Sequence, residues 1–175
     1  MELIEMIKKR RSVRKYTEEY IPEEKIGKVL QAGLLAPSGR ARRPWEFILV
    51  RDREMLKKMS ECREGGSAKM LAGADCAVVV VADPEKTDVW TEDCSIAMAF
   101  MHLAADSLGL GSCWIQGRLR NAPDGRTTEE YLRELLGFPE SYRLEAILSL
   151  GVPENHPAPR TGTDIAAEKI HRGRF

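Results

Sequence analysis

The 175-residue sequence has no excess charge of either sign, because 27 lysines and arginines are balanced by 27 aspartates and glutamates. A general nucleic-acid binder needs a basic field over a whole face, so this balance argues against one. The longest apolar run, within 76–82, is far too short to span a bilayer. The N-terminal residues 1–12 show no apolar core before a small-residue cleavage site, so we expect a cytoplasmic protein without a membrane partner.

Cysteine is scarce and shows no pattern. Cys62, Cys76, Cys94 and Cys113 lie far apart, and none of them forms a CxxC pair. This spacing argues against a zinc or iron–sulfur site, and against a disulfide framework outside a secretory context. No His, Asp or Glu set has metal-ligand spacing, and no Ser or Cys nucleophile motif is present. We expect reduced cysteines that serve packing, and no metal site.

The periodicity of the chain predicts alternating helices and strands in one domain, residues 1–175, of the α+β or α/β layered type. Between Pro22 and Pro37 the apolar face of a helix is expected to be buried. The segment 93–111 is apolar almost all round, which is typical of a helix at a domain centre or a subunit interface. Helices are expected within 1–12, 21–39, 53–64, 93–111 and 127–139, and strands within 45–52, 76–84, 112–117 and 144–153. The expected buried face of the second helix comprises Ile26, Val29, Leu30, Gly33 and Leu34.

The most unusual stretch is KKRRSVRKYT, residues 8–17, which carries six basic side chains in its first eight positions. A nucleic-acid backbone, a membrane surface and a single phosphate are the candidate anions. Because the rest of the chain neutralises this cluster, one bound anion fits better than a polyanion. The alternative is a solvated helix end, stabilised only weakly by the helix dipole.

Four stretches in this order resemble the FMN-dependent nitroreductase family: RRSVRKY (10–16), APSGRARRPWEF (36–47), DCSIAMAFMHLAADSLGLGSCWIQG (93–117) and LGVPENHPAPR (150–160). The resemblance runs from end to end. It implies an α+β three-layer sandwich, with a central mixed or antiparallel sheet flanked by helices, in an intertwined homodimer. Two FMN molecules would lie in the dimer interface, and the tail of about 152–175 would pack on the partner subunit.

On the family pattern, Arg10 takes the FMN phosphate, with Arg11 as a second candidate. Arginine suits phosphate because its planar fork can bind two oxygens at once. Ser12 and Arg14 would face the pyrimidine edge of the flavin ring. Arg160 matches the basic residue that closes over the phosphate; Arg172 and Arg174 are weaker candidates for that role.

The remaining implied contacts come from three further segments. Pro37, Ser38 and Gly39 match the segment that runs beside the flavin, but Ala41 stands where the pattern usually has Asn, and Arg43 where it has Gln. Backbone N–H groups at Gln116 and Gly117 would face flavin N5 and O4. Lys69 aligns with a lysine that reaches the flavin in some members, although an exposed helix lysine explains it equally well. His102 is expected to be a satisfied core histidine.

The resemblance implies a ping-pong reaction in which NAD(P)H reduces the flavin, and the flavin then reduces a small planar acceptor such as a nitroaromatic or a quinone. No protein residue is expected to act as a catalytic acid or base, because the cofactor carries the chemistry. The short link between Glu61 and Met70 predicts a shallow, permissive pocket. Two alternatives stay open: a dehalogenase, enoate reductase or flavin-cleaving enzyme on the same fold, and an FMN-binding redox sensor or carrier that never turns over nicotinamide.

Overall fold

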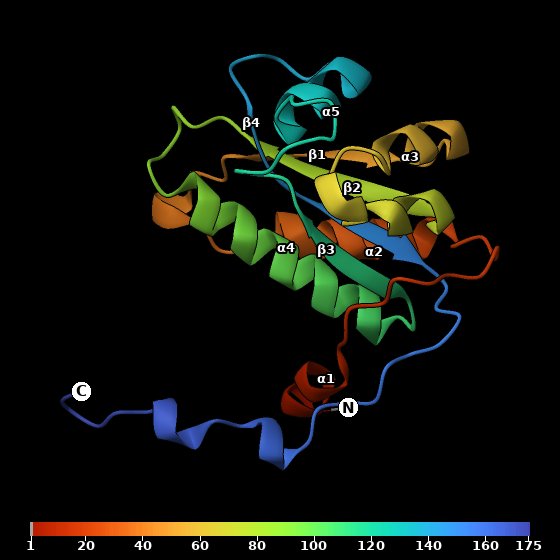
Figure 1. Cartoon of the computed structure of the whole chain (residues 1–175). Helices are drawn as coiled ribbons and strands as arrows, with labels where there is room; N and C mark the ends of the chain where they lie inside the picture. Colours follow the sequence, from red (N-terminus) through yellow and green to blue (C-terminus); the bar gives the residue numbers. More distant parts are fainter. Residues whose placement is uncertain (1) are drawn as a thin grey trace.

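The computed structural model describes residues 2–175 as a four-stranded antiparallel sheet between two helical layers (Figure 1). The predicted α+β three-layer architecture is confirmed, and the sheet is entirely antiparallel rather than mixed. Its strand order is β1-β2-β4-β3, so β3 lies at an edge. The strands are β1 (Trp45–Val50), β2 (Cys76–Ala82), β3 (Gly111–Gln116) and β4 (Arg143–Gly151). The helices are α1 (Leu3–Lys9), α2 (Glu23–Leu34), α3 (Arg53–Met59), α4 (Trp90–Ser107) and α5 (Thr128–Leu136).

The sheet separates two hydrophobic cores. Every residue of β2 is buried, as its unbroken β-branched run predicts for a central strand. Val78 and Val80 face the layer of α2 and α4, whereas Val79 and Val81 face the layer of α3 and α5. Because side chains alternate between the two faces of a strand, successive residues of β2 belong to different cores.

The helix α2 buries Ile26, Val29 and Gly33 as predicted, and Leu30 is partly buried. The prediction that Leu34 belongs to the same buried face is wrong, because 53% of this residue is exposed. At about 100° per residue, Leu34 lies at the margin of the apolar stripe and in the last helical position.

The central helix α4 buries Ala97, Met98 and Met101 against the sheet but presents Ile96 and Phe100 to solvent. The four cysteines are free and buried, as expected. Within residues 2–175 no group of side chains has the arrangement of a metal site. Among the helices of the same range, none is long and apolar enough to cross a membrane.

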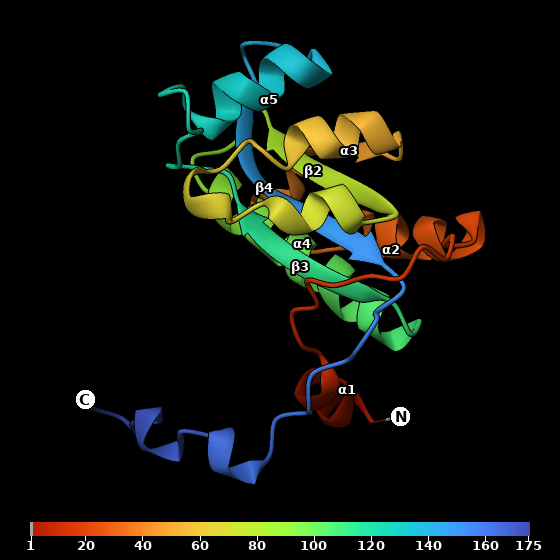
Figure 2. The same cartoon turned by 45° about the vertical axis from the view of Figure 1, so that its right-hand side comes forward.

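The C-terminal tail has two parts. Residues 152–160 run back along the N-terminal segment: Thr17 N donates to Val152 O (2.9 Å), and Arg160 N donates to Lys8 O (2.9 Å). Residues 161–175 then leave the body of the molecule, as both views show (Figures 1 and 2). This second part includes two short 3₁₀ turns, Gly162–Asp164 and Ala167–Lys169, and exposes Ile165, Ile170 and Phe175.

Candidate functional site

The basic stretch lies along the outer edge of β3. After α1 ends at Lys9, the chain becomes extended, and Val13 is buried against the sheet. Val13 N donates to Ser112 O at 2.9 Å, and Ser12 forms a parallel bridge with Ser112. One apolar residue therefore anchors the segment beside β3, and the basic residues lie on either side of it.

A neutral histidine holds Arg10 in place. The Nη1 group of Arg10 lies 2.7 Å from Nε2 of His102, and Nδ1 of His102 contacts the Ser112 hydroxyl. Burial, reinforced by the Arg10 charge, lowers the pKa of His102 to about 4. The ring is therefore neutral near pH 7; Nε2 accepts from Arg10, and Nδ1–H donates to Ser112. The expectation of a satisfied core histidine is confirmed.

Two further guanidinium groups, those of Arg11 and Arg160, lie near that of Arg10. Burial lowers the pKa of Arg10, and the charges of Arg160 and Arg11 lower it further, although Asp106 opposes them. Arg11 donates to the carbonyl of Ala158. In the described part of the chain, no carboxylate forms an ion pair with any of the three, and Asp106 is bonded to His156 at 2.7 Å instead. We call Arg10, Arg11 and Arg160 the anion cluster, because a bound anion would relieve their mutual repulsion.

The other end of β3 presents a backbone donor. Gly117 N donates to Glu145 O at 3.2 Å, so this amide is engaged inside the sheet. Because N–H groups alternate sides along a strand, the N–H of Gln116 faces the outer edge. Arg63 reaches the carbonyl of Gln116 on that same edge. Of the two amides expected to face a flavin, only that of Gln116 is directed outward.

The edge of β3 therefore joins two recognition elements. Ser112, beside the anion cluster, and Gln116 are four residues apart, which corresponds to about 13 Å along a strand. The side chain of Gln116 is held by Trp114 Nε1 (2.9 Å) and by the carbonyl of Arg118 (3.2 Å). This arrangement suits an elongated ligand with an anionic end and a flat, polar end. Arg14 also lies beside this edge, where its charge lowers the otherwise raised pKa of Cys113.

The loop that follows Pro37 lies elsewhere in the same chain. Gly39 N donates to Asp93 Oδ1 (2.7 Å), and Arg43 N donates to Ser38 Oγ (2.9 Å). Asp93 and His102 are nine residues apart on α4, about 13 Å along the helix axis. Within one chain, the structure thus shows no contact between this loop and the anion cluster. The loop is strained, because Arg40, Ala41 and Arg43 all have left-handed backbone conformations (φ 52°, 54° and 45°).

Lys69 begins a short 3₁₀ helix, Lys69–Gly73, rather than lying in the longer helices of its layer. Its side chain is 59% exposed and pairs with Glu61. This geometry is that of a surface lysine, and its contact with a flavin stays a prediction. The link before it contains one more 3₁₀ turn, Glu64–Gly66.

Sequence reasoning missed a pocket that begins where β3 ends. It has a volume of about 440 Å³, and its lining includes Trp90, Gly117, Arg118, Leu119, Arg120 and Arg143. It also missed Arg63, which donates to the carbonyl of Gln116 although the two residues are 53 positions apart in the sequence. The two arginines of GRLR (117–120), which directly follows Gln116, are the signal that could have pointed to the pocket. Trp90 and Arg143 join them only through folding.

Comparison with known proteins finds relatives with more than one kind of name, among them NAD(P)H nitroreductase and iodotyrosine deiodinase. The model of the nitroreductase family matches residues 7–62 and 58–152. A protein of Archaeoglobus fulgidus with the provisional name NADH dehydrogenase/NAD(P)H nitroreductase is 42% identical over 99% of each chain. The structure of an FMN-dependent nitroreductase from Clostridium difficile is 44% identical, covers 99% of this chain and 100% of its own, and superposes with a TM-score of 0.96. A NADPH:FMN oxidoreductase from Vibrio harveyi, solved with NAD⁺, is 27% identical over 98% of this chain and 77% of its own, with a TM-score of 0.81.

Proposed function

Because the chain belongs to the nitroreductase family, we propose that it is an FMN-dependent oxidoreductase that uses NAD(P)H to reduce electron-poor acceptors such as nitroaromatics and quinones. The observation that carries the proposal is the outer edge of β3. There, three guanidinium groups without ion-pair partners lie beside Ser112, and the outward-facing amide of Gln116 follows about 13 Å further along the strand. FMN is the cofactor named for the structural neighbour with the TM-score of 0.96, and its phosphate and ring fit the two ends of this edge.

The proposed binding mode assigns each end of the edge. Arg10, Arg11 and Arg160 hold the phosphate, because a buried dianion needs several matched donors. His102 keeps the guanidinium of Arg10 oriented from the opposite side without adding a charge. The amide of Gln116 faces the polar edge of the ring, and Arg14 lies near its pyrimidine part.

FMN, when bound, supplies the hydride chemistry that links NAD(P)H to the acceptor in a ping-pong cycle. The chain contributes binding and orientation. None of the described side chains along the edge from Ser112 to Gln116 is a carboxylic acid or an imidazole open to solvent. Near pH 7 the neutral His102 is committed to Arg10 and Ser112.

We also propose a homodimer. Leu3, Ile4 and Ile7 of α1 are 61%, 52% and 44% exposed, and Ile96 and Phe100 expose a second apolar surface on α4. A partner chain would cover these surfaces, receive the tail beyond residue 160, and bring its own Pro37–Ala41 loop to the flavin. The separation of this loop from the anion cluster within one chain supports that arrangement.

The test uses the purified full-length chain. We expect a yellow dimer whose extracted chromophore has the mass of FMN, and anaerobic NADH or NADPH should bleach its flavin band. Addition of 1,4-benzoquinone should restore the colour. A colourless monomer that does not take up added FMN would contradict the proposal. A yellow protein that neither donor bleaches would instead identify a flavin-binding sensor or carrier.

A further inference from the structure

We propose that the pocket beyond Gly117 selects aromatic acceptors that carry an anionic group, either a carboxylate or a sulfonate. The inference rests on the proposed function, since it specifies the second substrate of that site. Trp90, Arg118, Leu119, Arg120 and Arg143, which line the pocket together with Gly117, carry the argument. Its volume of about 440 Å³ lies within the range of small-molecule sites and holds one or two aromatic rings.

The pocket has an excess of positive charge. Arg118 and Arg120 form no ion pair in the part of the chain that the structure describes, and Arg120 Nη1 donates only to the carbonyl of Leu119 (2.9 Å). The one acidic residue among the pocket residues is Glu129, 3.7 Å from Arg143. Glu129 is already engaged by Arg133 (2.8 Å) and by Leu144 N (2.7 Å). Among the residues that line the pocket, three arginines therefore accompany one committed carboxylate. Arg118 also lies near Glu92 and Glu145: its charge lowers the pKa of Glu92 and opposes the rise that burial causes in the pKa of Glu145.

Trp90 and Leu119 contribute large apolar side chains to the lining of the pocket. The guanidinium of Arg118 lies 5.7 Å from the centre of the Trp90 ring, within cation–π range. Leu119 is 76% exposed and has a left-handed backbone (φ 57°), which a leucine rarely adopts. A strained backbone that exposes a leucine beside a pocket is typical of a functional site. An aromatic ring can pack between Trp90 and Leu119 with its anionic group on Arg118 and Arg120.

The pocket also lies next to the proposed position of the flavin ring. Gly117 lines it and directly follows Gln116, whose amide marks the proposed flavin ring. An acceptor whose anionic group is held by Arg118 and Arg120 would therefore direct its opposite end toward the flavin. The geometry predicts selectivity for para-substituted acceptors, in which the anionic group and the reducible group lie at opposite ends of the ring.

The experiment compares 4-nitrobenzoate with 4-nitrobenzyl alcohol, a neutral acceptor of similar size, on the holoprotein. In the double variant R118Q/R120Q, the ratio of kcat/KM for 4-nitrobenzoate to that for the alcohol should fall at least tenfold, because two charged hydrogen bonds are lost. The control variant R53Q/K57Q removes two exposed charges from α3, away from the pocket, and should leave the ratio within twofold. An unchanged ratio in R118Q/R120Q would overturn the inference.

A second measurement does not depend on turnover. Titration of the oxidised protein with 4-nitrobenzoate should quench tryptophan fluorescence saturably, and the signal should disappear in Trp90→Phe. Its dissociation constant should rise at least tenfold in R118Q/R120Q. Quenching by the alcohol with equal affinity would refute selectivity for the anion. Selective binding in a protein that NAD(P)H does not bleach would refute the proposed function and retain the pocket.

Discussion

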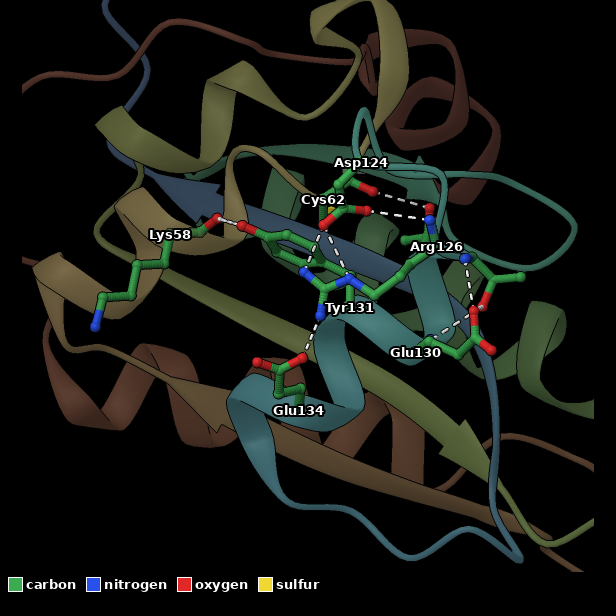
Figure 3. A network of polar contacts seen from close by, with 9 residues as sticks. Lys58, Cys62, Asp124, Arg126, Glu130, Tyr131 and Glu134 are labelled. Carbon is green, nitrogen blue, oxygen red and sulfur yellow. Dashed lines mark hydrogen bonds and ion pairs between the residues drawn. The ribbon is translucent and has the colours of Figure 1, made fainter.

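Two clusters of charged side chains, one around Arg126 and one around Arg10, differ in what balances the arginine charge. Near the start of α5, Arg126 Nε donates to Asp124 (2.9 Å), and the same guanidinium pairs with Glu134 and lies 4.7 Å from the centre of the Tyr131 ring (Figure 3). In the anion cluster, by contrast, Arg10 and Arg11 are bonded to a neutral imidazole and a backbone carbonyl. The first arginine is paired with carboxylates of its own chain. Within residues 2–175 the arginines of the anion cluster form no ion pair, although the charges of Asp106 and Asp164 lie near them.

This difference shows how an arginine-rich segment can be interpreted. The partners of Arg126 lie within eight residues of it, so sequence alone indicates a locally neutralised helix start, which the Thr127–Glu130 capping box reinforces. Around Arg10 the nearest residues along the chain are also basic. The supply of nearby carboxylates, rather than the number of arginines, therefore separates a structural cluster from a candidate ligand site.

The largest effect is expected at Arg10. Arg10→Met removes the central donor of the anion cluster, so we expect FMN to bind roughly a hundredfold more weakly, about 2–3 kcal/mol for charged hydrogen bonds to phosphate. Arg10→Lys keeps the charge but lacks the planar guanidinium fork, so its FMN affinity should lie between those of the unsubstituted protein and Arg10→Met. The measurement is FMN titration of the apoprotein by flavin fluorescence quenching. Equal affinity in all three proteins would show that the cluster does not bind the phosphate.

His102 should make the stability of the protein depend on pH. Its pKa of about 4 in the folded chain lies below the unfolded value of about 6.5, so only the unfolded chain takes up a proton as pH falls between those values. Stability from this residue is therefore complete above pH 6.5 and is lost toward pH 4, by about 2 kcal/mol at pH 5. Urea unfolding at pH 7 and pH 5 measures it. His102→Gln should show a smaller loss between the two pH values; an identical loss would contradict the assignment.

The loop of Arg40, Arg42 and Arg43 offers a third basic segment, and its strain can be tested at Ala41. Asn tolerates the left-handed conformation better than Ala, so Ala41→Asn should stabilise the fold by up to about 1 kcal/mol in urea unfolding. Ala41→Gly is the matched control, since it relieves strain without adding an amide. Tighter FMN binding in Ala41→Asn alone would place this position at the cofactor; destabilisation by both variants would refute the strain.

The smallest effect is expected at Arg126. Because its ion pairs are exposed and belong to the chain itself, Arg126→Gln should leave FMN affinity unchanged and lower the melting temperature only slightly. FMN titration and thermal unfolding measure the two quantities. A loss of FMN affinity comparable to that of Arg10→Met would remove the distinction between the clusters.

Much of the fold could be predicted from the sequence, because its signals are local. The β-branched run of β2 and the Thr127 cap of α5 each act over a few residues. The left-handed backbone at Ala41 and Leu119 could not, since neither residue favours that conformation. Arg63 and Trp90 were missed because their neighbours at the site are distant along the chain. Arg160 was identified only through the family resemblance, since 150 residues separate it from Arg10.

The exposed edge of β3 has a consequence for the protein before its cofactor arrives. Of its outward backbone groups, the carbonyl of Ser112 accepts from Val13 N and the carbonyl of Gln116 accepts from Arg63. An incompletely covered strand edge can template pairing with a second polypeptide. Cells starved of riboflavin should therefore accumulate this chain in the insoluble fraction, and riboflavin supplied during synthesis should return it to the supernatant.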